Sequence, residues 1–118
     1  MTALFLTEDL MFASRVGAQA NSLNIQIETV SSVAQLGESL SCQPTLFVVD
    51  LAAVPTDQLK ATVETVRNRA PGATIIAFGP HVWEAKLEAA RQAGCNQVLS
   101  RGQFHKEMSD LLQQYLPG

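Results

Sequence analysis

Two short runs of almost uninterrupted apolar residues constrain this chain more than any other feature. One is Thr45–Val49, which follows Pro44. The other is Ala73–Phe78, which is bounded by turn-forming Pro and Gly residues on both sides. Strands that are apolar at consecutive positions, rather than at alternate ones, are typical of a parallel sheet with helices on both faces. The runs therefore predict the central strands of an α/β protein.

The rest of the chain alternates between strand-like and helix-like segments. Residues 3–6 and 97–99 are short apolar segments, and residues 24–30 alternate with period two, as expected of a strand nearer an edge. Apolar residues spaced by three and four predict five helices. These helices are expected around residues 12–23, 33–40, 59–66, 83–90 and 104–115.

Five strands alternating with five helices predict a three-layer αβα sandwich with right-handed crossovers. The flavodoxin-like strand order 2-1-3-4-5 is the commonest solution at this length, and its site lies at the carboxyl ends of strands one and three. Helix caps are predicted at Ser31 or Ser32 and at Thr56, and Gly94 is a suitable residue to follow the fourth helix. Pro117-Gly118 is predicted to stop the last helix.

Composition bounds the function. With 118 residues, 47% of them hydrophobic, the chain is expected to form one domain over residues 1–118, with no output domain. Eight basic and 11 acidic residues leave no basic patch for nucleic acid or for an anionic membrane. The N-terminus has no leader pattern, which predicts a cytoplasmic protein. Cys42 and Cys95 have neither zinc-site nor disulfide-framework spacing and are expected to be plain thiols.

Acids follow both strands whose carboxyl ends form the site in this fold. Asp50 ends the run 45–49, and Glu8 and Asp9 follow the first strand. Because these strand ends meet at one edge of the sheet, the acids form a candidate site. The alternative reading of Asp50 is an acid that caps the next turn through its side chain. The alternative reading of Glu8 and Asp9 is the start of a helix, whose dipole favours acids.

Chain length, element order and these acids together resemble the receiver domain of two-component response regulators, the CheY-like proteins. The segment Leu46–Leu51 is similar to the family's third strand with its phosphoacceptor, here Asp50, and Ala93–Arg101 is similar to the approach to its last strand. The resemblance implies a domain of this fold in signal transduction. It also implies a magnesium ion held by the phosphoacceptor and an acid pair, and a histidine kinase as phosphodonor.

The chain departs from the family pattern at the magnesium and switch positions. The acid pair aligns with Thr7 and Glu8, or, if shifted by one residue, with Glu8 and Asp9. The first alignment leaves one carboxylate besides Asp50 and weakens the expected magnesium site. The position after the fourth strand, where the family has a Thr or Ser hydroxyl, is Gly79. The resemblance is therefore to an atypical receiver.

The position of the family's lysine is Arg101, and Gly102 follows it instead of a proline. The guanidinium is suited to a bidentate contact with Asp50 or with a phosphate. We expect Arg101 to serve instead as a structural ion-pair partner of the acids. The family's aromatic residue on the fifth strand is replaced by Val98.

The first functional hypothesis is a non-enzymatic interaction module whose phosphorelay switching is impaired or lost. It would bind a signalling protein, or a second copy of itself, through the fourth helix, fifth strand and fifth helix near Trp83, Val98 and Phe104. The alternative is a working, magnesium-dependent phosphoacceptor at Asp50. A third reading is a small-ligand binder of flavodoxin-like fold, although the chain lacks a Gly-rich phosphate loop.

The two histidines carry separate expectations. His81 follows the turn after the fourth strand, at the rim of the candidate site, where a base or a pH-sensitive group would be placed. No Ser or Cys nucleophile accompanies it at fitting spacing, so an ordinary loop residue is the favoured reading. His105 is expected to lie on a polar flank of the last helix, in contact with solvent.

Overall fold

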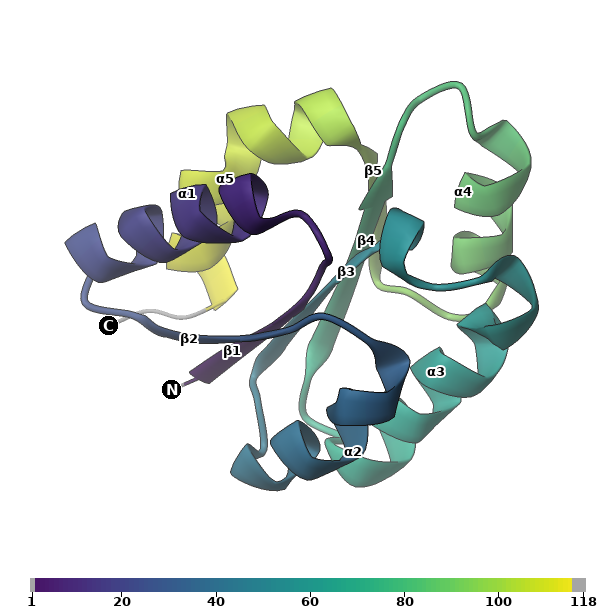
Figure 1. Cartoon of the computed structure of the whole chain (residues 1–118), viewed down its shortest axis with the longest axis horizontal. Helices are drawn as coiled ribbons and strands as arrows, with labels where there is room; N and C mark the ends of the chain where they lie inside the picture. The colour runs from purple at the N-terminus through teal and green to yellow at the C-terminus, as the bar shows by residue number, and fades with distance from the viewer. Residues whose placement is uncertain (1, 116–118) are drawn as a thin grey trace.

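The two apolar runs form neighbouring central strands of a five-stranded parallel sheet (Figure 1). The structure is a computed structural model and describes residues 2–115. The sheet has the predicted order β2-β1-β3-β4-β5, so β2 and β5 are its edges. The strands are β1 (Thr2–Leu6), β2 (Gln26–Val30), β3 (Leu46–Asp50), β4 (Thr74–Gly79) and β5 (Gln97–Ser100). Every residue of β3 is buried, as expected of a strand covered on both faces.

Helices cover both faces of the sheet. One face carries α1 (Leu10–Ser22) and α5 (Arg101–Tyr115), which lie side by side. The other face carries α2 (Leu36–Ser39), α3 (Thr56–Arg69) and α4 (Glu84–Gln92) (Figure 1). Each face has its own cluster of buried apolar residues. The fold class and the strand order predicted from the sequence are therefore confirmed.

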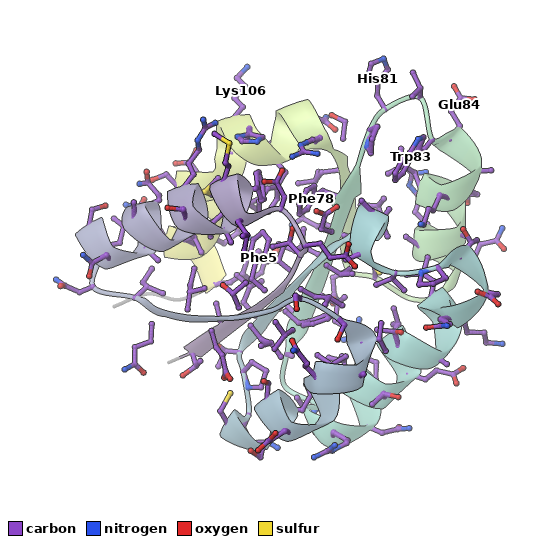
Figure 2. All side chains as sticks on the ribbon, viewed as in Figure 1. Phe5, Phe78, His81, Trp83, Glu84 and Lys106 are labelled. Atoms are coloured by element: carbon purple, nitrogen blue, oxygen red, sulfur yellow. The ribbon has the colours of Figure 1, made fainter. Side chains whose placement is uncertain are left out.

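Four phenylalanines hold α1 and α5 to their face of the sheet. Phe5 and Phe78 come from β1 and β4, and Figure 2 shows both rings beneath the two helices. Phe12 of α1 and Phe104 of α5 pack on them, with Phe78 and Phe104 stacked at 4.6 Å between ring centroids. Aromatic pairs of this kind contribute about 0.5–1.5 kcal/mol beyond the area that they bury. The cluster fixes the helices that flank the candidate site.

The second predicted helix is broken into short pieces. A 3₁₀ turn over Val33–Gln35, the single-turn α2 and a further 3₁₀ turn over Leu40–Cys42 replace one continuous helix. Residues 36–42 contain one glycine, two serines and a cysteine, all poor helix formers, so the segment gains little from a regular helix. The apolar spacing was nevertheless informative, because Leu36 and Leu40 are buried.

Among the boundary predictions, the cap at Ser32 is right in position, two others are wrong by one or two residues, and one cannot be compared. Ser32 is the N-cap of the first 3₁₀ turn but makes no capping bond with its side chain. Pro55, rather than Thr56, precedes α3 as its N-cap. The second strand begins at Gln26 because Asn24 adopts a left-handed conformation, with φ of 58°. Pro117-Gly118 lies outside the described residues.

An arginine and an asparagine fasten the amino end of the sheet, opposite the candidate site. Arg67 donates to the backbone oxygens of Ala73 and Gly94 and, at 2.7 Å, to Oδ1 of Asn96. The same amide oxygen accepts the N–H of Ile75 at 2.8 Å. Gly94 has the positive φ of 103° expected of the predicted glycine after α4. This network joins α3 to the loops that precede β4 and β5.

Candidate functional site

The candidate site lies at the carboxyl ends of β1 and β3, where the strand order places ligand sites in this fold. Leu6 pairs with Val49, so the next residues, Thr7 and Asp50, stand opposite each other. The acid pair Glu8 and Asp9 follows at once and leads into α1. The parallel register thus brings the predicted acids to one edge of the sheet.

Asp50 is buried and accepts a hydrogen bond at each of its carboxylate oxygens. Its residue exposure is 3%, the lowest of any acid in the described chain. Oδ2 accepts the Thr7 hydroxyl at 2.7 Å, and Oδ1 accepts the N–H of Ala52 at 3.0 Å. The second bond caps the 3₁₀ turn Leu51–Ala53, which confirms the predicted capping role. Asp50 is thus a buried carboxylate whose two oxygens accept hydrogen bonds from neutral donors.

Thr7 connects the inner part of the site with the loop to α1. It is buried, with 2% exposure, and its backbone N–H donates to the oxygen of Val30. While its hydroxyl donates to Asp50, the same oxygen accepts the N–H of Asp9 at 3.1 Å. The sequence showed Thr7 only as the replacement of an acid. Its role as the donor to Asp50 follows from the register of β1 against β3.

Asp9 begins α1, as the alternative reading of the acid pair expected. Its Oδ1 accepts the N–H of Phe12 at 3.0 Å, which makes it the N-cap. The Phe12 N–H, followed by the guanidinium of Arg101, holds the pKa of Asp9 below its usual value. Glu8 is exposed. The two acids thus point to different surroundings.

Arg101, the first residue of α5, engages Asp9. Its Nη2 lies 2.5 Å from Asp9 Oδ2, and its Cζ lies 5.4 Å from the centroid of the Phe12 ring. Both charged side chains are partly exposed, at 40% for the arginine and 36% for the aspartate. The structure therefore places the ion pair between α5 and α1, whereas the oxygens of Asp50 are held by Thr7 and Ala52.

The position of the missing hydroxyl has an apolar wall. A β-carbon on Gly79 would lie 3.4 Å from both Cβ and Cδ1 of Leu51 and 3.7 Å from Cε3 of Trp83. Leu51 is fully buried and follows Asp50 directly. Sequence reasoning overlooked it, although an apolar residue directly after a buried strand is a signal of burial. A β-carbon at residue 79 would make ordinary van der Waals contact with both side chains.

The acids do not fit a magnesium ion. Magnesium requires several oxygen ligands in near-octahedral geometry. Each of the four carboxylate oxygens of Asp9 and Asp50 accepts a bond from a protein donor, and one of these donors is a cation. Within residues 2–115, no three His, Cys, Asp or Glu side chains are grouped so that they could hold a metal. The roles assigned to Asp50, Arg101 and Gly79 by resemblance remain predictions.

The two histidines differ in their surroundings. His81 is exposed in the loop before α4, next to Trp83 and Glu84 at the rim (Figure 2). His105 is half-buried, with its ring 4.5 Å from that of Phe12, so the predicted contact with solvent is only partial. The cause is the packing of α5 against α1. Burial, then the charge of Arg15, lowers the pKa of His105.

The state of the two cysteines and the character of the helices can also be compared with the sequence. Cys42 and Cys95 are free thiols, as predicted, and burial raises the pKa of Cys95 to about 11. Among the helices of residues 2–115, none combines the length and apolar character needed to cross a membrane.

A parallel αβα sandwich of order 2-1-3-4-5 is the flavodoxin-like fold, which receiver domains share, and here an aspartate ends β3. No protein-family model and no curated protein sequence matches the chain. Solved structures match the chain over nearly its whole length, and many of them are receiver domains. The chain has the CheY-like receiver fold of response regulators.

Three solved structures illustrate the likeness. A two-component response regulator from Clostridium difficile is 13% identical with a TM-score of 0.80, and the match covers 99% of this chain and 96% of that one. The receiver domain of a Pseudomonas aeruginosa sensor histidine kinase, with magnesium in its active-site cleft, is 18% identical, with a TM-score of 0.79 and coverage of 99% and 98%. A pilus assembly-related protein from Burkholderia pseudomallei is 20% identical, with a TM-score of 0.75 and coverage of 98% and 88%. The likeness establishes the fold alone, because the matched proteins include both kinase-linked receivers and pilus-assembly proteins.

Proposed function

We propose that this domain is a non-enzymatic, receiver-like signalling module that acts by binding another protein and does not need phosphorylation to do so. The observation that carries the proposal is the state of Asp50. Its carboxylate is buried and accepts hydrogen bonds at both oxygens from Thr7 and Ala52. The 3% exposure limits the access of a phosphodonor, and attack would use an oxygen that already accepts a hydrogen bond, so this arrangement disfavours acyl-phosphate formation.

The surroundings of Asp50 support the same conclusion. Phosphoryl transfer depends on groups that neutralise the charge of the transferred group. Arg101, at the position of the family's lysine, is engaged by Asp9. Gly79 supplies no hydroxyl, and the space beside it is bounded by Leu51 and Trp83. The proposed module therefore keeps the receiver scaffold and lacks the groups that would respond to a phosphoryl group.

The surface that we assign to a partner is the exposed apolar start of α4. Val82 and Trp83 are 70% and 38% exposed, and they line a surface hollow with Thr56, Glu84 and Lys86. Lys86 Nζ stands 5.3 Å from the indole centroid, which holds the ring in place. Figure 2 shows this segment at the outer rim of the molecule. Phe104, which the sequence suggested for the same surface, is buried in the aromatic cluster and is excluded from it.

The test of the phosphate-independent character is chemical phosphorylation. The chain is incubated with acetyl phosphate and Mg²⁺, and its intact mass is measured, with a responsive receiver domain and the Asp50→Asn variant in parallel. We expect no added phosphoryl mass on the wild type. A phosphoryl adduct that disappears in Asp50→Asn would support the alternative, a working phosphoacceptor.

Binding to a partner is tested separately by immobilising the chain and identifying retained proteins by mass spectrometry. Retention should be unchanged in Asp50→Asn and reduced at least severalfold in Trp83→Ala, because a large partly exposed aromatic is a preferred anchor of interfaces. Met11→Ala, which changes a more exposed apolar residue on α1 (81% against 38% for Trp83), is the control. Equal retention by Trp83→Ala and wild type would contradict the assignment of this surface. Gel filtration of the wild type and of Trp83→Ala tests whether the partner is a second copy of the chain.

A further inference from the structure

Arg101 is held on two sides at the edge where the receiver family has a divalent cation. Its guanidinium pairs with Asp9 and lies over the ring of Phe12. The ion pair is the only contact within 4.0 Å between oppositely charged side chains that joins two elements in residues 2–115, since Arg91 and Glu88 both lie in α4. Among the described residues, Arg101 is thus the one cation paired with the acids of the edge.

The position of Arg101 is fixed by the packing of α5 on α1. Three polar contacts run along the two helices at intervals of four residues on α5, beginning with Arg101 on Asp9. The second is Arg15 Nη1 to His105 Nδ1 at 3.4 Å, and the third is Gln19 Nε2 to Ser109 Oγ at 3.2 Å. We call these three contacts the α1–α5 ladder. It keeps the guanidinium at the edge without any ligand.

The ladder also makes the edge unfavourable for a second cation. Arg101, Arg15 and His105 line a small surface hollow with Asp9, Met11 and Phe12. The hollow thus has two permanent positive charges against one carboxylate. A divalent ion brought next to Asp9 would be repelled by the guanidinium of Arg101, whose Nη2 lies 2.5 Å from Asp9 Oδ2, and by Arg15, which lines the same hollow.

We propose that Arg101 is a resident substitute for the divalent metal, so that its guanidinium neutralises the acidic edge and excludes Mg²⁺. This inference rests on the proposed function and concerns the regulation of the same site. The substitution of Arg101 for the metal explains why Asp9 has a bound cation at this edge although the acids do not fit a metal. A receiver-like domain with its counter-ion built into α5 would have the same conformation at any magnesium concentration.

The test is a metal titration on the whole chain, with Mg²⁺ alone as the probe and calorimetry as the readout. The proteins compared are wild type, Arg101→Met, Thr7→Asp and the double variant Thr7→Asp/Arg101→Met, which form a double-mutant cycle. Arg91→Met is the matched control, since it removes an exposed arginine that pairs with an acid elsewhere, in α4. Circular dichroism checks that each variant is folded.

We expect no saturable Mg²⁺ binding by wild type or Arg91→Met. The double variant should bind Mg²⁺ about tenfold more tightly than Thr7→Asp alone, because only the double variant has lost the competing charge. Equal affinity of these two variants, or binding by the wild type as tight as that of the double variant, would overturn the proposal.

If Thr7→Asp does not fold, the comparison of Arg101→Met with wild type answers the same question. A gain of Mg²⁺ binding in Arg101→Met supports the proposal, and the absence of a gain overturns it. The outcome is separable from that of the proposed function. Acetyl phosphate reacting with the wild type would refute phosphate independence, whereas the titration alone decides the role of Arg101.

Discussion

Two carboxylates at the same edge of the sheet use the same local device in different surroundings. Asp50 accepts the N–H of Ala52, and Asp9 accepts the N–H of Phe12, each bond being 3.0 Å long. Both aspartates therefore cap the turn or helix that follows them. The second oxygen of Asp50 is met by a buried neutral hydroxyl, and that of Asp9 by a partly exposed cation.

This difference between the two aspartates predicts that one pair contributes to the stability of the fold and the other to the charge of the site. A buried carboxylate that loses a hydrogen bond keeps the full cost of its desolvation. A partly exposed ion pair that is broken is rehydrated and is screened by salt, so it contributes little. The inner pair, Asp50 with Thr7, should therefore matter most for folding. The outer pair, Asp9 with Arg101, should matter most for the charge of the site.

The largest effect is expected from Thr7→Val, which removes the hydroxyl and keeps the shape. The Oδ2 atom of Asp50 would then be buried without its donor, and the free energy of unfolding should fall by about 1–3 kcal/mol. Urea unfolding measures the change. Thr65→Val is the control, because Thr65 is exposed and its hydroxyl bonds within α3. If Thr7→Val were as stable as Thr65→Val, the bond from Thr7 to Asp50 would contribute nothing special to folding, and the distinction between inner and outer pairs would be lost.

A smaller effect is expected at acid pH from Arg101→Met. The pKa of Asp9 is lowered in the folded protein, so its contribution is present above the unfolded value, 3.8, and is lost as the pH falls through the folded value. Without Arg101, one cause of the lowered pKa of Asp9 is gone, so the stability that is lost on acidification should be smaller. Thermal unfolding measured from neutral pH down to about pH 2 tests this. A slope identical to that of the wild type would show that the Phe12 N–H alone determines it.

The smallest effect is expected from His105→Gln near neutral pH. Because the folded pKa of His105 is below 6.5, the unfolded chain binds the proton more readily, and stability falls as the pH drops below about 6.5. His105→Gln should flatten the stability profile in this range. The control variant is His81→Gln, which changes the exposed histidine in the loop before α4. A profile of His105→Gln as steep as that of the wild type would mean that His105 is not confined against Arg15 and Phe12.

The fold was predictable because it is encoded in repeated, local signals. The continuous apolar runs of β3 and β4 and the helical spacing of residues such as Leu59 and Val63 need no long-range information. The segment 33–42 was less predictable, since burial of Leu36 and Leu40 is compatible with either a helix or successive tight turns. Low helix propensity favoured successive turns over one helix there, while packing buried the two leucines.

The composition of the site was predictable, but its pairings were not. The resemblance and the strand order brought Asp50, Thr7 and Arg101 to one edge. Which carboxylate receives the guanidinium depends on the side-chain path of Arg101 along Phe12, and a sequence does not encode that path locally. The wall beside Gly79 was hidden for the same reason, because Leu51 and Trp83 approach it from separate loops.

The packing of α5 over α1 has a consequence for the order in which the chain folds. The aromatic cluster takes Phe5 and Phe12 from the start of the sequence, Phe78 from the fourth strand and Phe104 from α5. On the ribosome, the first three rings therefore emerge long before the ring that stacks on them. A nascent chain that has not yet reached Arg101 exposes an aromatic surface on β1, β4 and α1. Completion of this face, and protection of the chain from aggregation, must wait until α5 has been synthesised.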